Sequence, residues 1–255
     1  MKISIITVVF NNVDTVAAAV ESVIHQDYEN IEYIIIDGGS DDGTLDILKE
    51  YKEHFVTFIS EPDEGIYDAM NKGLKIATGD IIGILNADDL YSNNSIIAKV
   101  VDEFKGKGGD AIYGDLQYVD KENKKIIRNW KAGSYNRENF KKGWMPPHPT
   151  FFVRKEIYRK YGYFNENFKI AADYELMLRF LYKNKISVSY IPEVLVRMRT
   201  GGESNSSFAN RLQIIREDYK AWKVNDLDAK LYTQVLKRLT KLRQYLPILS
   251  IPLLW

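Results

Sequence analysis

The chain has 255 residues, of which 45% are hydrophobic and 27% charged, so it is long enough to bury a full core and is not of disordered or collagen-like composition. Its 35 basic and 35 acidic residues balance, which argues against non-specific nucleic-acid binding. Cysteine is absent, which excludes disulfides, zinc–thiolate sites, iron–sulfur clusters and thiol nucleophiles, so the chemistry must use oxygen and nitrogen groups.

The first hundred residues alternate between β-branched runs and amphipathic helical patterns, which is typical of βαβ units around a mostly parallel sheet. We expect strands at 3–10, 31–37, 55–60 and 80–85. Apolar residues at helical spacing predict helices at 16–24, 67–77 and 96–104, the first of them with Asp14 as its N-terminal cap.

After Gly114 the predicted strands become shorter, at 116–119 and 125–130, following one at 111–113. A helix at 172–183, a strand at 186–192 and a loop at 201–207 come next, and the pattern is helical from residue 208. We therefore predict an α/β fold whose sheet is parallel in its first half and mixed in its second, with a domain boundary near residue 205.

Polar residues follow each of the first four predicted strands. In an open α/β sheet, ligands bind beyond the carboxyl ends of the strands. Each polar segment alone is explained by turn chemistry, but their position at one edge of one sheet indicates a binding site. These segments are 11–12, 37–44, 61–65 and 86–89.

The glycine-rich segment after the second strand differs from the common nucleotide-binding loops. It is not Gly-x-Gly-x-x-Gly and does not follow the first strand, and Thr44 and Leu45 stand where a Walker loop needs Lys and then Ser or Thr. Asp37, at the end of the strand, is instead placed to accept hydrogen bonds from a nucleoside base or ribose.

Asp88 and Asp89 are adjacent carboxylates after the fourth apolar strand. Such oxygen ligands hold hard divalent cations, Mg²⁺ or Mn²⁺, against a diphosphate. The alternative is that the pair caps the helix that follows.

Six ordered segments of residues 1–205 together resemble the family 2 glycosyltransferases of the GT-A fold. They are IITVVFN at 5–11, IDGGSDDGT at 36–44, DEGIYDAMNKG at 63–73, NADD at 86–89, AADYEL at 171–176 and GG-x-S at 201–204. The resemblance implies a GT-A catalytic domain at 1–205, with a nucleotide-sugar-binding half at 1–114 and an acceptor-binding half at 115–205. It also implies inverting transfer from a nucleotide sugar, most commonly a UDP-sugar, in bacterial cell-surface polysaccharide biosynthesis.

Carried over by position, the resemblance implies that Thr7, Val9 and Asp37 contact the nucleoside base. It places Asp88 at the ribose and the metal, and makes Asp89 a ligand of the Mg²⁺ or Mn²⁺ that bridges the phosphates. The usual acidic tripeptide is reduced here to Ala87-Asp88-Asp89. We expect further contacts to the nucleotide sugar from Asn11, Gly39, Asp68, Asn71, Lys72, Asn86 and Arg199.

Asp173 matches the family's catalytic base, which removes the proton from the attacking hydroxyl; the alternative is a helix N-cap. We place His148 and Glu175 on the acceptor side, although His148 is also explained as a packed loop residue. Arg197 and Arg199 either close over the diphosphate or form an ordinary surface pair.

Two other classes are considered. A sugar nucleotidyltransferase shares the sheet and the metal, but needs a basic glycine-rich loop after the first strand, where this chain has Phe10-Asn11-Asn12. A non-catalytic nucleotide-sugar-binding protein needs no base. The presence of Asp88, Asp89 and Asp173 argues against this class.

The C-terminal segment 229–255 differs electrostatically from the rest, with five basic residues and no acid, so that residues 1–228 carry −5. We expect a helical extension at 206–255 whose basic, Trp-terminated tail lies on an anionic membrane; the alternatives are packing on the core and a homodimer interface. Because the N-terminus has no secretory signal pattern, we expect a cytoplasmic protein at the inner face of the membrane.

Overall fold

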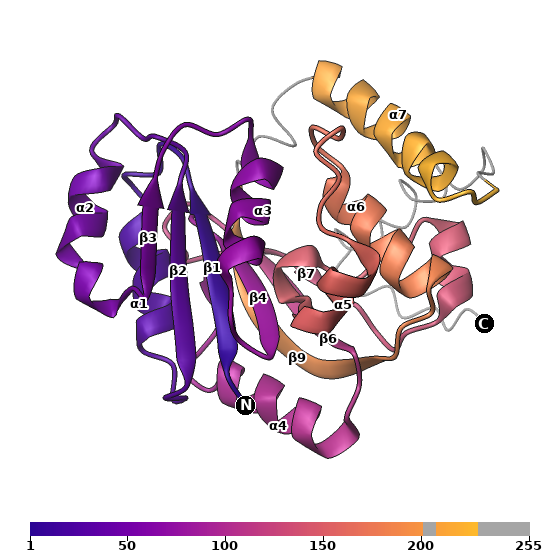
Figure 1. The fold of residues 1–255 in the computed structure, drawn as a ribbon, viewed down its shortest axis with the longest axis horizontal. Coiled ribbons are helices and arrows are strands. Elements are labelled where there is room, and N and C mark those ends of the chain that lie inside the picture. The colour runs from indigo at the N-terminus through magenta and orange to yellow at the C-terminus, as the bar shows by residue number, and fades with distance from the viewer. Residues whose placement is uncertain (201–207, 229–255) are drawn as a thin grey trace.

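The computed structural model describes residues 1–200 and 208–228. These residues form a nine-stranded sheet with the order β3-β2-β1-β4-β8-β6-β9-β5, and β7 pairs with β6 (Figure 1). The strands are β1 (Ile3–Val9), β2 (Ile31–Asp37), β3 (Thr57–Ser60), β4 (Ile81–Asn86), β5 (Asp89–Tyr91), β6 (Ala111–Val119), β7 (Ile126–Trp130), β8 (Phe152–Arg154) and β9 (Val188–Arg199).

Seven α-helices accompany these strands within the described residues. They are α1 (Val16–Ile24), α2 (Thr44–Glu50), α3 (Ile66–Ile76), α4 (Ile96–Lys107), α5 (Lys155–Tyr161), α6 (Ala172–Met177) and α7 (Phe208–Val224). Short 3₁₀ turns occur at Lys52–His54, Arg137–Lys142 and His148–Thr150, and α6 continues as a π-helical segment at Leu178–Lys183.

The first half is the predicted parallel sheet. β1 pairs in parallel with β2 on one side and with β4 on the other, so the strand order reverses between β1 and β4. All seven residues of β1 are buried, because helices cover both faces, as is usual for parallel sheets. The reversal is the topological switch point at which open α/β sheets bind their ligands.

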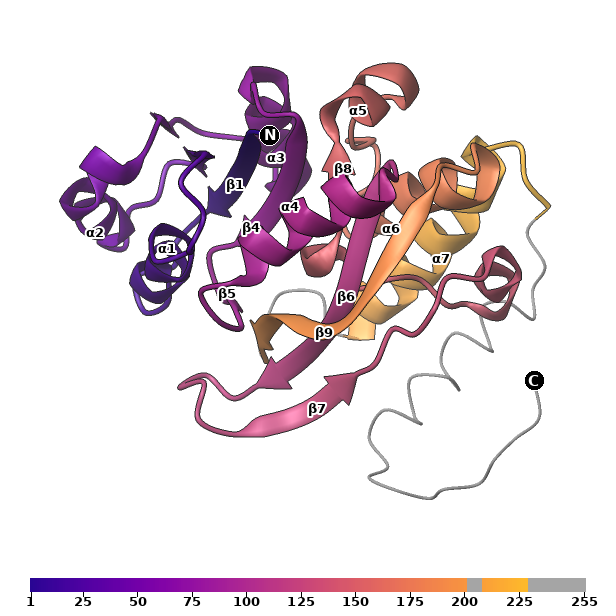
Figure 2. The same ribbon diagram turned by 90° about the horizontal axis from the view of Figure 1, so that it is seen from below.

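Side chains of alternate β1 residues enter two separate cores. Ile3, Ile5 and Val9 pack with α1, α2 and α4 on one face of the sheet, and Ile6 and Val8 pack with α3 on the other. The second core continues into α5, α6 and α7, and Figure 2 shows α1 and α4 on the opposite side of the sheet. This sandwich is the mostly parallel α/β fold expected from the sequence.

The second half is mixed, as predicted, but two of its strands, β6 and β9, are longer than expected. β6 runs without a break through Gly114, where a Cβ would lie 2.4 Å from Leu195 Cγ. β9 passes through Pro192, because its pairing with β6 steps from Ile191 directly to Val194. A proline has no amide hydrogen, and this bulge keeps it out of the ladder.

Two local expectations need correction, and four elements were not expected. Asp14 does not cap α1, whose N-cap residue is Thr15 without a side-chain hydrogen bond. Asp88 and Asp89 do not cap the next helix, because α4 begins after Ser95. Strand β5, which begins at Asp89, was not expected, nor were α2, β8 and α5.

The helix predicted from residue 208 is present as α7, and it packs on α6 (Figure 1). Ala221 and Trp222 are buried in the same core as α6, and the Trp222 indole donates a hydrogen bond to the Tyr174 hydroxyl at 2.9 Å. The predicted loop at 201–207 and the basic tail at 229–255 lie outside the described residues. Within the described ranges, no helix is both long and apolar enough to cross a bilayer.

Candidate functional site

The loop after β2 is built around the carboxylate of Asp37. This fully buried group accepts hydrogen bonds from the amides of Gly39 (3.0 Å) and Ser40 (3.1 Å) and from the hydroxyls of Ser40 and Ser60. Gly39 has a φ of +86°, which favours glycine. Asp37 therefore fixes the path of the glycine loop, and its predicted contact with a nucleoside stays a prediction.

Asn11 joins this loop to the end of β1. Its amide donates to the Ser40 hydroxyl at 2.8 Å, and its side-chain carbonyl accepts the Asp41 amide at 3.0 Å. Asn11 has a φ of +50°, a conformation that asparagine tolerates better than most residues. The two loops at the carboxyl edge are thus held as one unit.

The other predicted base contacts on β1 lie beneath this edge. Thr7 is fully buried, with its hydroxyl 3.2 Å from that of Tyr33, and Val9 is 3% exposed. Phe10, which sequence analysis did not single out, is 59% exposed and directly follows β1. An exposed aromatic residue at a polar strand end is the signal that could have identified it.

Asp88 and Asp89 lie at the end of β4, next to the switch point. Asp89 is fully buried and accepts a hydrogen bond from the Asn86 side chain at 3.1 Å. One carboxylate oxygen of Asp89 and the side-chain oxygen of Asn86 are buried without a hydrogen-bond partner. Burial, and then the neighbouring Asp88 carboxylate, raise the pKa of Asp89 well above its usual range, and burial also raises that of Asp88.

Arg199, at the end of β9, supports this acidic pair. It is 8% exposed and donates to the backbone carbonyls of Asp88 at 3.0 Å and Lys121 at 2.9 Å. Its charge lowers the pKa of both carboxyls but does not offset their burial. In this conformation Arg199 anchors the acidic pair from within the fold, so the surface-pair interpretation of Arg199 is wrong, and its predicted contact with the diphosphate stays a prediction.

The unpartnered oxygens fit a hard divalent cation. No group of three or more His, Cys, Asp or Glu side chains able to hold a metal occurs in the described part of the chain. Mg²⁺ is commonly held by one or two carboxylates together with substrate phosphates. Asp88, Asp89 and Asn86 are the residues that would supply oxygens to such a shared site, at which a cation would stabilise negative charge on a diphosphate.

The polar side chains of α3 have partners within the protein. Asn71 is buried and bonds both the amide and the carbonyl of Phe164 at 2.9 Å, as well as the Glu166 carboxylate. Lys72 pairs with Glu61 at 3.0 Å and with Asp68 at 3.4 Å. Asn71 therefore links the two halves of the fold, and Lys72 neutralises acidic residues beside the loop before α3.

Asp173 lies in the first turn of α6 and is partly exposed, among buried neighbours. The N-cap of α6 is Ala171, so the capping interpretation of Asp173 is wrong. The charge of Asp173 affects the pKa of two side chains from other segments. It adds to burial in raising the pKa of Tyr67, and it opposes the burial that lowers the pKa of His148.

One hydrogen bond and two ring contacts bring three separate segments together near Asp173. Tyr67, in the first turn of α3, donates a hydrogen bond to the Ile170 carbonyl at 2.6 Å and stacks on Phe164 with ring centroids 5.5 Å apart. His148 packs edge-on against the same Phe164 ring at 5.6 Å. A carboxylate, an imidazole and aromatic rings therefore converge beside the first turn of α3.

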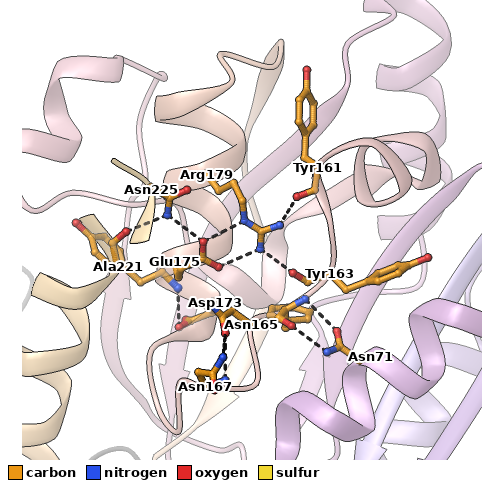
Figure 3. Close-up of polar contacts among 12 residues, drawn as sticks. Asn71, Tyr161, Tyr163, Asn165, Asn167, Asp173, Glu175, Arg179, Ala221 and Asn225 are labelled. Carbon is orange, nitrogen blue, oxygen red and sulfur yellow. Dashed lines mark hydrogen bonds and ion pairs between the residues drawn. The ribbon is translucent and has the colours of Figure 1, made fainter. Parts of the chain in front are cut away.

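Glu175 does not belong to this partly exposed group. It is 2% exposed and forms two 3.0 Å contacts with the guanidinium of Arg179, and it accepts the Asn225 amide at 2.9 Å (Figure 3). Arg179 also donates to the carbonyls of Tyr161 and Tyr163. We therefore leave Glu175 out of the proposed acceptor site, because its carboxylate is used inside the fold.

The fold recurs among solved structures that hold a bound nucleotide sugar. S. aureus TarS residues 1–349, in complex with UDP-GlcNAc, matches 92% of this chain and 69% of its own with a TM-score of 0.68 at 18% identity. The mannosyltransferase PcManGT from Pyrobaculum calidifontis, in complex with GDP-Man and Mn²⁺, matches 93% of this chain and 68% of its own chain. The TM-score is 0.64 at 17% sequence identity. In another TarS structure the match spans 43% of that chain. The fold is thus the GT-A glycosyltransferase fold.

Sequence comparison identifies the family. The model of glycosyl transferase family 2 matches residues 4–165, and the chain belongs to this family. An uncharacterized glycosyltransferase of Mycobacterium tuberculosis is 34% identical over 193 residues, covering 69% of this chain and 68% of its own. A PGL/p-HBAD biosynthesis glycosyltransferase of Mycobacterium bovis is 28% identical over 214 residues, which cover 80% of this chain and 79% of the relative. The prediction of a family 2 glycosyltransferase is confirmed.

Proposed function

We propose that this glycosyltransferase moves a sugar from a UDP-sugar to a hydroxyl of a glycan or lipid-linked glycan, with inversion at the anomeric carbon. One observation carries the proposal: Asp89 and Asn86 present buried, unpartnered oxygens at the switch point between β1 and β4. That arrangement suits the cation and diphosphate of a nucleotide sugar. The UDP-GlcNAc bound to TarS, which shares the fold, supports UDP as the nucleotide.

The nucleotide occupies the carboxyl edge of β1, β2 and β4 in this proposal. Phe10 offers an exposed ring against which a base can stack, and the Asp37 loop borders it. Asp88 lies toward the ribose, and Asp89 faces the diphosphate. Mg²⁺ or Mn²⁺ held there would offset the negative charge of the leaving nucleotide.

Asp173 acts on the other side of the transferred sugar. Its carboxylate takes the proton of the acceptor hydroxyl as the hydroxyl oxygen attacks the anomeric carbon. The bond from that carbon to the diphosphate oxygen breaks, and UDP leaves with the electron pair. His148, half-buried near Asp173, borders the acceptor.

A panel of nucleotide sugars tests the donor. UDP-GlcNAc, UDP-glucose and GDP-mannose are compared with Mn²⁺ present, by thermal stabilisation and by nucleotide release. We expect a UDP-sugar to give both signals and Asp173→Asn to lower turnover at least about a hundredfold while nucleotide binding is kept. Near-normal turnover of Asp173→Asn would place the base elsewhere, with His148 the next residue to replace.

The cellular setting of the reaction is part of the proposal. We place the enzyme at the cytoplasmic face of the membrane, where the basic segment 229–255 meets anionic lipid, in cell-surface polysaccharide assembly. The relative named for PGL/p-HBAD biosynthesis is consistent with a glycolipid acceptor. Truncation after Asp228 should abolish salt-sensitive binding to anionic vesicles and leave UDP affinity unchanged. If the full chain ignores such vesicles at low salt, this segment packs on the protein or joins two copies.

A further inference from the structure

The backbone immediately before Asp173 is held by one side chain from α7. The carboxylate of Glu217 accepts hydrogen bonds from three consecutive amides, those of Lys169 (3.0 Å), Ile170 (2.9 Å) and Ala171 (2.9 Å). Two of these bonds go to one oxygen, and the other oxygen also accepts the Gln213 side-chain amide at 3.0 Å. Asp173 follows the last of the three amides by two residues.

Glu217 is suited to this task by its charge and its burial. It is 7% exposed. Burial alone would raise the pKa of its carboxyl, but the hydrogen bonds from Gln213 and the three amides outweigh burial and lower it. The group is therefore an ionised acceptor, and hydrogen bonds to a charged acceptor are stronger and more directional than neutral ones. Without it, one buried and two partly buried amides would lose their partner.

The same backbone is held from the opposite side by α3. The hydroxyl of Tyr67 donates to the carbonyl of Ile170 at 2.6 Å, and that carbonyl belongs to one of the residues whose amides Glu217 binds. Lys220, one turn after Glu217, adds a bond to the Asn167 carbonyl at 2.9 Å. The segment before Asp173 thus has fixed contacts on both sides, one set from the nucleotide half and one from α7.

We propose that Glu217 is a positioning residue for glycosyl transfer: its carboxylate fixes the 169–171 backbone and so sets where Asp173 meets the acceptor hydroxyl. The inference rests on the proposed function of Asp173 as the base. Glu217 touches no reacting atom, and it acts by holding the chain to which the base is attached. A residue after 205 would therefore help to position the base of the catalytic half.

The effect should appear in kcat rather than in binding of the sugar donor. A base works only within hydrogen-bond reach of its proton, and a displacement of about 1 Å can cost roughly a hundredfold in rate. We expect Glu217→Ala to lower kcat by about ten- to a hundredfold, with KM for the nucleotide sugar within about twofold. Glu217→Gln keeps one carbonyl oxygen for the amides and should recover part of the lost rate.

Asn225→Ala is the matched control. Asn225 is 2% exposed on the same C-terminal segment, and its side chain bonds Glu175 and the Ala221 carbonyl but none of the three amides. All variants are assayed well below their melting temperatures. Asn225→Ala should lower the melting temperature and leave kcat within about twofold. Hydrogen exchange at 169–171 should accelerate in Glu217→Ala and not in Asn225→Ala.

The outcomes separate this inference from the proposed function. If Asp173→Asn is inactive and Glu217→Ala keeps kcat within twofold, the positioning role is wrong and the base assignment stands. The inference is also overturned if Asn225→Ala loses as much kcat as Glu217→Ala, or if the loss falls on KM for the nucleotide sugar. If Asp173→Asn is fully active, it is the base assignment that fails, and the positioning role fails with it.

Discussion

Removal of the Glu175 carboxylate tests what holds α6 to the rest of the molecule. Glu175→Ala leaves the Arg179 guanidinium, whose side chain is 16% exposed, without its carboxylate partner and with only the carbonyls of Tyr161 and Tyr163 as acceptors. Two 3.0 Å contacts to Arg179 and one 2.9 Å contact to Asn225 are lost together. Removing one partner of a buried ion pair typically costs about 3–5 kcal/mol. For a chain of this size, that corresponds to a fall in Tm of roughly 6–20 °C.

Differential scanning calorimetry and urea denaturation provide the assay. An exposed ion pair serves as the control: Lys49 and Asp46 lie 2.8 Å apart on α2 with side chains 62% and 81% exposed. Asp46→Ala should change stability by less than about 0.5 kcal/mol. A loss below about 1 kcal/mol for Glu175→Ala would refute the reasoning, because it would mean that the released guanidinium finds water or another acceptor at little cost.

Three further predictions concern the acid dependence of stability and the nucleotide site. Burial would raise the pKa of Glu32, but hydrogen bonds from Lys2, Ser4 and Thr78 outweigh it and lower the pKa from 4.5 to about 2. Its stabilisation, about 3 kcal/mol, is therefore complete above pH 4.5 and lost as the pH falls toward 2, so Glu32→Gln should flatten the acid limb of the stability profile. UDP should raise Tm with Mn²⁺ and much less with EDTA, and Asp89→Asn should remove that difference; equal stabilisation with and without metal contradicts the shared site. Asp37→Ala should lower the free energy of unfolding and weaken UDP binding, by about 1–3 kcal/mol each, because its carboxylate orders the glycine loop; an unchanged Tm in a thermal scan would contradict that role.

The parallel half of the fold is predictable because its pattern is local. A strand buried on both faces needs an apolar run such as that of β2, and the observed bounds of 31–37 coincide with the predicted ones. The second half is less predictable because long-range pairing decides it. β9 extends through Pro192 only because a bulge against β6 accommodates the proline, and nothing near Pro192 in the sequence announces its partner strand.

Some residues of the candidate site could likewise be predicted from the sequence, and others could not. Asp88 and Asp89 could be found from their position after a strand, and Asp173 from its match to a family motif. The distinction between Asp173, which is partly exposed, and Glu175, which is buried against Arg179, depends on which face of α6 meets the core. Glu217 could not be found from the sequence, because its partners are backbone amides 46 to 48 residues away.

Because Glu217 lies 46 to 48 residues after the amides that it binds, this clamp can form only late in synthesis of the chain. Chains are made from the N-terminus, and their earlier parts generally fold first. Strands β1 to β4, with the loops that border the nucleotide in the proposed function, lie within the first 90 residues. The segment that carries Asp173 cannot receive its carboxylate clamp until α7 has been synthesised and has packed on α6. In the proposed function, most of the segments that border the nucleotide are therefore synthesised before the helix that holds the backbone of the base.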